Sequence, residues 1–289
     1  MVNEGSADAV RRTALETLDD WIATHEADPA PSDDGRSWGD HVRAWRAGGA
    51  SDLHVASIIA ATTIWTADKS VNALVVDELI ERGHDVHARD GRGRTPLAFA
   101  FAVVGEWLDS PRCGGAAIWR KRVETGLLKT MRALRNDPLV ARTTSDFDAA
   151  DDLGATALHH AIGLERAALG EEVVDSLVLC GADPNRPLNN GDRPIHLACR
   201  HNPSVIAALL SGDGARADPG LRDGAGSLPL ELAVVGRYVG SVEGLLAGGS
   251  DPNAANGAGE PLLAVALLDQ LEWGHGVIAR ALKDHGAIC

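Results

Sequence analysis

The sequence lacks the features of a secreted or membrane-spanning chain. No apolar run approaches the ~20 residues that a transmembrane helix needs. The first residues, Met1 to Arg12, do not contain a basic segment followed by an apolar core, which would be typical of a secretory signal. These absences favour a cytoplasmic protein.

Positive charge is also scarce. The 289 residues carry a formal net charge of −14, and lysine is rare beside arginine. Nucleic acids and anionic membranes both bind to basic surfaces, so we expect neither as the main partner. The preference for arginine, with abundant alanine and glycine, favours a bacterial origin. With 45% hydrophobic and 24% charged residues, the composition is that of a folded protein of one large or two ordinary domains.

Cysteine and catalytic motifs are sparse as well. Four cysteines (Cys113, Cys180, Cys199 and Cys289) include no CxxC pair, so we interpret them as free thiols and buried packing residues. The sequence has no GxSxG, HExxH or P-loop motif. We therefore predict no catalytic residue, no cofactor and no metal ion, and a protein that is not an enzyme.

One stretch nevertheless gathers possible zinc ligands. Cys180, Asp183, His196 and Cys199 lie within the 21 residues CGADPNRPLNNGDRPIHLACR. A zinc site needs such side chains to converge tetrahedrally on one ion. The stretch belongs to a repeated pattern that places these residues on different elements, so we favour a structural interpretation.

The repeated pattern is a glycine followed by proline, leucine and alanine at fixed offsets. The clearest copies read Gly93-Arg-Thr-Pro-Leu-Ala-Phe-Ala100, Gly191-Asp-Arg-Pro-Ile-His-Leu-Ala198 and Gly226-Ser-Leu-Pro-Leu-Glu-Leu-Ala233. A second motif, Gly181-Ala-Asp-Pro-Asn185, returns as Gly249-Ser-Asp-Pro-Asn253. The residues in the proline position are Asp52, Pro96, Ala157, Pro194, Pro229 and Pro261, at spacings of 44, 61, 37, 35 and 32 residues.

Local chemistry explains the pattern. Proline suits the first position of a helix because the N–H that it lacks would have no helical partner there. The apolar residues of 173–179 recur at helical spacing and predict a second helix. A glycine such as Gly181, Gly249 or Gly286 then ends that helix in a left-handed conformation. Asp-Pro-Asn predicts the turn of a projecting finger.

The motif and its spacing resemble the ankyrin-repeat family from about Gly48 to Cys289. The resemblance implies an all-α fold, an ankyrin-repeat solenoid of helix-turn-helix units with β-turn fingers, and an N-terminal helical cap. It also implies that His54, His159 and His196 brace the fingers. The expected boundaries are 1–47 for the cap segment and 48–90, 91–150, 151–189, 190–222, 223–255 and 256–289 for the repeats.

Two repeats are longer than the family period. We expect their extra residues between or within the two helices, at 62–69 in the first and 105–126 in the second. Residues 1–47 show no repeat, but Leu18 and Trp21 belong to an apolar helical stripe, and Ser37-Trp-Gly-Asp40 is a weak capping box. We interpret this segment as the cap that covers the first repeat.

Tryptophan is concentrated outside the regular repeats. Two interpretations stay open: a satellite core in which cap and insertions pack together, or an exposed hot spot for a partner. The seven tryptophans are Trp21, Trp38, Trp45, Trp65, Trp107, Trp119 and Trp273.

Ankyrin repeats bind partners through finger tips and a concave groove, and the resemblance places the groove six and seven residues past the proline position. Most of these residues are apolar here. We expect self-coverage at the N-terminal end and exposure towards Arg200–Tyr238. Arginines on the fingers could contact an acidic protein surface, or form a rim neutralised by Asp90, Asp192 and Asp223. The predicted partner-binding residues are Arg89, Arg92, Arg186, Arg193, Arg200, His201, Arg222, Arg237 and Tyr238.

The sequence therefore predicts a non-catalytic module that binds another protein, as an inhibitor or immunity protein or as an adaptor. Two alternatives are a small-molecule sensor that uses the apolar groove and an enzyme with its site in the 105–148 insertion.

Overall fold

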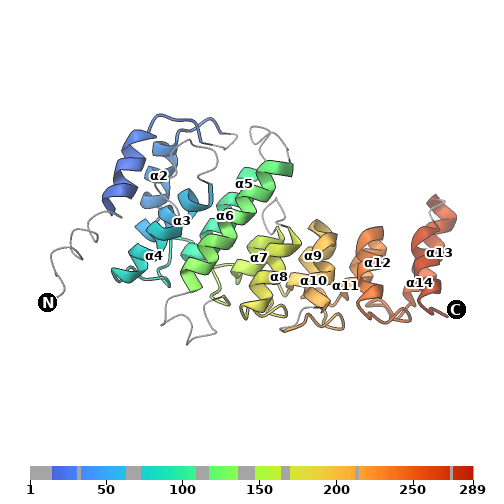
Figure 1. Ribbon diagram of the computed structural model, residues 1–289. Coiled ribbons are helices and arrows are strands. Elements are labelled where there is room, and N and C mark those ends of the chain that lie inside the picture. Colours follow the sequence, from blue (N-terminus) through green and yellow to red (C-terminus); the bar gives the residue numbers. More distant parts are fainter. Residues whose placement is uncertain are drawn as a thin grey trace. The chain divides into compact units, whose positions relative to one another are not determined.

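The computed structural model describes residues 15–30, 34–62, 73–108, 117–135, 147–163, 170–211, 215–273 and 276–288 (Figure 1). Within these ranges the secondary structure is helical apart from two isolated β-bridges. The predicted all-α fold is confirmed. Two compact units are present: unit 1 contains Met1–Asp152 and Glu165–Ala167, and unit 2 contains Leu153–Leu164 and Ala168–Cys289. No helix of the described residues is both long and apolar enough to cross a bilayer.

Unit 2 is built from helix pairs in two layers (Figure 1). The first helices of successive pairs contact one another in order, and so do the second helices, as expected of stacked repeats. The first layer contains α7 (Ala157–Ile162), α9 (Pro194–His201), α11 (Pro229–Val235) and α13 (Leu262–Trp273). The second layer contains α8 (Glu171–Leu179), α10 (Ile206–Ser211, preceded by the 3-10 turn Pro203–Val205), α12 (Val239–Ala247) and α14 (Val277–Asp284).

The helices of unit 2 begin and end as their sequence predicts. Proline occupies the first position of α9 and of α11. After α8 the backbone of Gly181 has φ 101°, and the N–H of Ala182 reaches back to the carbonyl of Leu177. Gly249 and Gly286 repeat the left-handed conformation after α12 and α14, with φ of 90° and 96°.

The Asp-Pro-Asn motif ties each repeat to the next. The Oδ1 atom of Asp183 accepts the backbone N–H of Asn185 at 2.8 Å and closes the turn. The Asn185 side chain then donates to the carbonyl of Arg216 at 2.8 Å and accepts the N–H of Asp218 at 2.7 Å. The motif that suggested metal ligands is therefore a hydrogen-bonded junction between repeats.

Unit 1 contains the two elongated repeats. Helix α3 (Asp52–Thr62) pairs with α4 (Ala73–Glu81), and α5 (Pro96–Leu108) pairs with α6 (Ala117–Arg135). Helix α6 has 19 residues, whereas α8 has 9, so much of the extra length extends a helix as expected. Helix α6 contacts both α3 and α5, and at Gly126 its backbone lies against Ala61 of α3.

The non-repeat segment packs on unit 1. A helix over residues 15–24 precedes α2 (Trp38–Ala47), which begins with the predicted capping box between Ser37 and Asp40. Trp38 of α2 makes edge contacts with Trp21 and with Trp107 of α5, at ring-centroid distances of 5.1 and 5.2 Å. All three indoles are buried. The satellite-core interpretation is confirmed for them; Trp65 and the side chains of Trp119 and Trp273 lie outside what the structure describes.

Candidate partner-binding site

The repeat histidines are structural, as the resemblance implies. His54 Nδ1 accepts the N–H of Ser51 at 3.2 Å, so its Nε2 carries the proton and donates to the Arg94 carbonyl of the following repeat at 3.0 Å. His196 Nε2 likewise donates to the carbonyl of Ser227 at 3.2 Å. Burial lowers the pKa of both His54 and His196, because the charged imidazolium would lose its hydration.

A carboxylate performs the same task in the next repeat. Glu231 occupies the histidine position of α11, where it accepts the N–H of Leu228 at 3.3 Å. Its other oxygen accepts the N–H of Gly257 in the following finger at 3.2 Å. His196 donates a hydrogen bond to the next finger and Glu231 accepts one from the next finger, so both residues tie a helix to the following finger.

Three of the predicted partner-binding arginines donate hydrogen bonds to finger carbonyls. Arg89 donates to the carbonyl of Ala150 at 2.6 Å and also to that of Gly93. Arg222 makes the equivalent bond to Gly226 at 2.7 Å. Arg193 donates to the carbonyl of Asn185.

Arg200 also forms its ion pairs within the protein. Its guanidinium donates to both carboxylate oxygens of Asp192, at 2.9 and 3.1 Å, and lies 3.6 Å from Asp223 of the next finger. The hydrogen bonds from Arg200 lower the pKa of Asp192. Asp90, in unit 1, pairs with Arg94. The three aspartates that were expected to neutralise an arginine rim therefore pair with Arg200 and Arg94.

The other five predicted residues are exposed. Arg92 and Arg186 lie on fingers, His201 ends α9, and Arg237 and Tyr238 form the turn between α11 and α12. Arg237 adopts φ 59°, the left-handed conformation that a residue with a Cβ rarely takes.

The groove positions differ sharply between the two units. In unit 1, Ile58 and Ile59 of α3 are fully buried, and Val103 of α5 is 6% exposed. In unit 2, Val235 of α11 is 63% exposed and Leu268 of α13 is 65% exposed. The expected coverage at the N-terminal end and exposure towards Arg200–Tyr238 are both confirmed.

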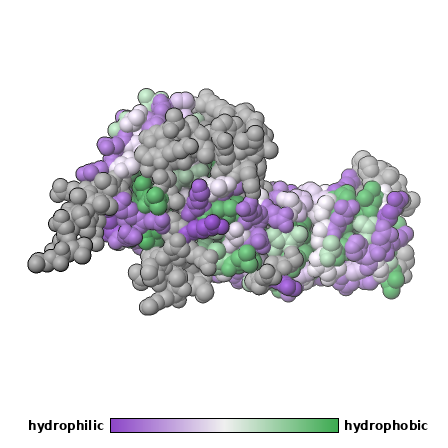
Figure 2. Space-filling view, viewed as in Figure 1, coloured by the Kyte–Doolittle hydropathy of each residue, from purple (hydrophilic) through white to green (hydrophobic). Residues whose placement is uncertain are grey.

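Val235 adjoins the predicted residues Arg237 and Tyr238 in the turn between α11 and α12, and Leu268 lies on the neighbouring helix α13. Tyr238 and Val239 are 39% and 37% exposed, and α11 and α13 contact each other. Figure 2 shows apolar residues at the surface of the regular repeats among polar ones. We define the turn surface as Val235, Arg237, Tyr238, Val239 and Leu268. Val235, Val239 and Leu268 were absent from the predicted site, although two of them occupy groove positions that the repeat spacing identifies.

The described residues offer little for metal or thiol chemistry. No group of three His, Cys, Asp or Glu side chains in these ranges is arranged to hold a metal ion. Burial raises the pKa of the Cys199 thiol to about 12, so this side chain stays protonated, whereas a thiolate is the form that binds metals and attacks electrophiles.

Comparisons with known proteins agree with this geometry. A family model described as ankyrin repeats (3 copies) matches residues 164–256. The crystal structure of the ankyrin repeat domain of Bcl-3, described as a unique member of the IkappaB protein family, is similar with a TM-score of 0.53. Residues 164–256 are ankyrin repeats, and the fold is that of an ankyrin repeat domain. The similarity to Bcl-3 covers 83% of this chain and 88% of that domain at 21% sequence identity, which concerns the fold alone.

The matched ankyrin repeats include most of the turn surface. Residues 164–256 contain helices α8 to α12, and with them Val235 to Val239. Ankyrin repeats are in general protein-binding modules, and partner contacts are expected where such an array leaves apolar side chains exposed.

Proposed function

We propose that this ankyrin-repeat protein binds a partner protein through the turn surface and the finger tips of unit 2, in the bacterial cytoplasm and without catalysing a reaction. The exposure of apolar groove residues carries the proposal. Val235 and Leu268 are mostly exposed at positions that are buried in unit 1. Burial of apolar area contributes ~25 cal/mol per Å², so a partner that covers these side chains gains affinity.

Arg237 and Tyr238 give the turn surface its specificity. Arginine and tyrosine are enriched among residues that dominate binding energy. The left-handed backbone places the exposed Arg237 between Val235 and Tyr238 at a cost of ~1–2 kcal/mol. Backbone strain of this kind collects at functional sites. An arginine inside an apolar surface favours a partner with a carboxylate at the matching point, in keeping with the expected acidic partner surface.

Among the finger arginines, Arg186 fits a direct role best. It is exposed, and its sequence neighbours Asp183 and Asn185 close the turn. Arg89, Arg193 and Arg222 contribute by holding finger shape. A module of this kind suits an inhibitor or immunity protein, or an adaptor. The small-molecule alternative is less favoured because the groove positions Ile58 and Ile59 in unit 1 are buried.

Affinity capture from an extract of the source organism, followed by mass spectrometry, tests the proposal. The wild-type protein is compared with a Val235→Asp/Leu268→Asp double variant and with Leu74→Asp, which changes an equally exposed leucine on α4. We expect a protein that is retained by the wild type and by Leu74→Asp and lost with the double variant. Equal retention by all three would exclude the turn surface from the interface.

The contribution of Arg186 is tested with the partner so identified. Arg186→Ala is expected to weaken binding about three- to tenfold and to reduce its salt dependence, because an exposed charge acts mainly through screened attraction. Unchanged affinity and salt dependence would remove this finger from the interface.

A further inference from the structure

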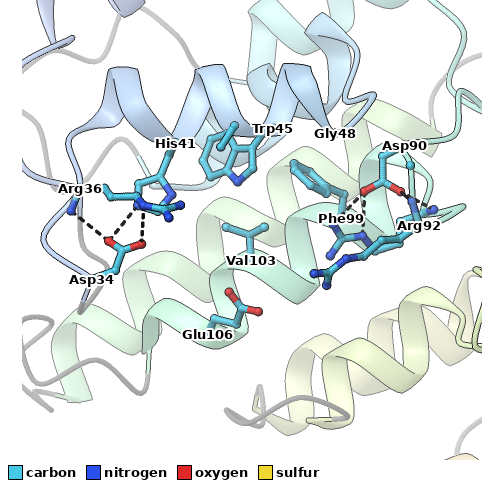
Figure 3. A pocket seen from close by; sticks show the side chains of 13 residues that line it. Asp34, Arg36, His41, Trp45, Gly48, Asp90, Arg92, Phe99, Val103 and Glu106 are labelled. Carbon is cyan, nitrogen blue, oxygen red and sulfur yellow. Dashed lines mark hydrogen bonds and ion pairs between the residues drawn. The ribbon is translucent and has the colours of Figure 1, made fainter.

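Unit 1 contains a pocket of about 430 Å³, within the range of ligand-binding sites (Figure 3). One wall comes from the non-repeat segment, namely residues 34–36 and helix α2. The opposite wall comes from the finger at residues 90–94 and from helix α5. The repeats alone do not form this pocket, because α2 supplies half of it.

Figure 3 shows Trp45 and Val103 in the middle of the pocket, with Glu106 beside Val103, and further charged side chains at both ends. Trp45 of α2 faces Phe99 of α5, with ring centroids 5.8 Å apart, and Val103 lies one helical turn further along α5. Asp34 and Arg36 lie at one end, and Arg92 lies at the other.

The end near the finger is held rigidly. The Arg94 guanidinium donates to Asp90 Oδ2 at 2.8 and 2.9 Å and lies 4.7 Å from the centre of the Phe99 ring. Both Arg94 and Asp90 are buried. Because this pair is fixed by hydrogen bonds and ring contact, the wall exists before a ligand arrives, which reduces the entropic cost of binding.

The dimensions select an extended ligand. The pocket follows α2 from His41 to Gly48, which corresponds to ~10 Å at 1.5 Å per residue. An extended chain covers ~10 Å with three residues. A short extended segment therefore matches the length of the pocket.

The charges select a ligand that is neutral overall. Three carboxylates (Asp34, Asp90 and Glu106) and three guanidinium groups (Arg36, Arg92 and Arg94) line the pocket. Asp34 pairs with Arg36 and Asp90 pairs with Arg94, so the charges balance within the lining and favour neither an anion nor a cation. A peptide backbone offers one donor and one acceptor at each residue, so it suits walls that contain both kinds of partner.

We propose that this pocket binds an extended segment of three to four residues from a partner protein, with one apolar side chain placed between Trp45 and Val103. The backbone on either side of that residue pairs with the charged ends of the pocket. This site lies in unit 1 and is independent of the turn surface of unit 2, so either can fail without the other.

Capped synthetic peptides and the full-length chain test the assignment. The probe is Ac-Gly-Ser-Leu-Ser-Gly-NH₂, and its comparison peptide has glycine in place of leucine. Binding is followed by the NMR shift of the Trp45 indole N–H, identified with a Trp45→Phe variant. We expect the leucine peptide to bind about tenfold more tightly, as burial of one leucine side chain implies.

Two matched variants locate the binding site. Ala44 and Ala47 are both exposed on α2, but only Ala44 lines the pocket. Ala44→Phe is expected to weaken peptide binding at least tenfold by filling the pocket, and Ala47→Phe is expected to leave it unchanged. Both changes are on the surface, so the fold is preserved.

Two outcomes overturn the proposal. Equal binding of the leucine and glycine peptides, or equal loss in both variants, rules out the pocket as a peptide site. The single-residue probe Ac-Leu-NHMe separates peptide from small molecule. If it binds as tightly as the pentapeptide, the flanking backbone makes no contact and the pocket is a small-molecule site.

Discussion

Units 1 and 2 share one repeat motif, yet they treat equivalent positions in opposite ways. Ile58 and Ile59 of α3 are buried in unit 1, where the long helix α6 contacts both α3 and α5. In unit 2 the second helices are short, and Val235 and Leu268 stay exposed. The comparison indicates that groove positions exposed in regular repeats become part of the core in a unit with elongated repeats.

Helix α2 of the N-terminal cap likewise covers one face of α5. Phe99, Val103 and Trp107 lie four residues apart along one face of that helix, and Trp38 and Trp45 of α2 pack against it. What remains accessible there is a bounded pocket, whereas unit 2 retains an open surface. Two kinds of binding site thus arise from one motif.

The largest effect is expected from breaking the aromatic cluster of unit 1. Trp38→Ala should lower the free energy of unfolding of unit 1 by ~3–5 kcal/mol, as for other buried aromatic residues. Urea unfolding followed by tryptophan fluorescence measures this, since six of the seven tryptophans belong to unit 1. Leu268→Ala, on the exposed surface of unit 2, should change stability by no more than ~0.5 kcal/mol. A similar small change for Trp38→Ala would contradict the cluster's role as a core.

The contact between α6 and α3 gives the next largest effect. A Cβ added to Gly126 would lie 2.4 Å from the carbonyl oxygen of Ala61. Gly126→Ala should therefore destabilise unit 1 by ~1–3 kcal/mol, although alanine is the better helix former. At Gly240 of α12 the nearest atom to such a Cβ is 3.6 Å away, so Gly240→Ala should stabilise unit 2 slightly. Stabilisation by both substitutions, measured by urea unfolding, would mean that α6 does not press on α3.

Substitutions of Arg237, whose backbone is strained, distinguish its effect on the stability of unit 2 from its effect on partner binding. Arg237→Gly should raise the free energy of unfolding by ~1 kcal/mol because glycine adopts the left-handed conformation freely. The same variant should bind the captured partner more weakly. Arg237→Ala keeps the Cβ, so it should lose binding without the gain in stability. Equal unfolding midpoints for the two variants would argue against backbone strain at this turn.

A smaller gain in stability is expected from giving His196 Nδ1 a hydroxyl partner, in the repeat that begins at Pro194. Thr156 provides a hydroxyl to Nδ1 of His159 at 2.9 Å, whereas His196 Nδ1 and Arg193 Nε are buried without hydrogen-bond partners. Arg193→Thr should supply the hydroxyl and remove the buried guanidinium nitrogen, for a net stabilisation of ~0.5–1 kcal/mol after loss of the bond to Asn185. Arg193→Val, which has the same branching without the hydroxyl, should not show this gain in thermal unfolding.

The smallest effect is the response to acid. Burial lowers the pKa of His41 and His54 in unit 1 and of His196 in unit 2. The unfolded chain takes up protons below its histidine pKa of ~6.5, whereas the folded state resists them, so stability should fall as the pH drops from ~7 towards ~5. His196→Gln should flatten this dependence for unit 2 while unit 1 keeps it, as urea midpoints at several pH values would reveal. An unchanged slope would mean that His196 is not a source of the acid sensitivity.

Local chemistry made much of the fold predictable. Pro194 and Pro229 begin helices, and Gly181 and Gly249 end them, because each residue type suits one backbone conformation. The capping box at Ser37 was predictable for the same reason. The binding site was harder to predict from the sequence. Arg89, Arg193 and Arg222 look like free charges on the fingers, but in the structure they donate hydrogen bonds to nearby backbone carbonyls.

The sequence by itself determined the repeat, its helix ends and its fingers, since these depend on residues that lie within a few positions of one another. Only the tertiary structure decided which side chains remain available to a partner. Arg200 is committed to Asp192 and lies beside Asp223 of the next finger, and the Trp45 pocket forms only when α2 lies on α5. The contact with Asp223 and the contact of α2 with α5 join residues far apart in sequence, so they depend on how the elements pack.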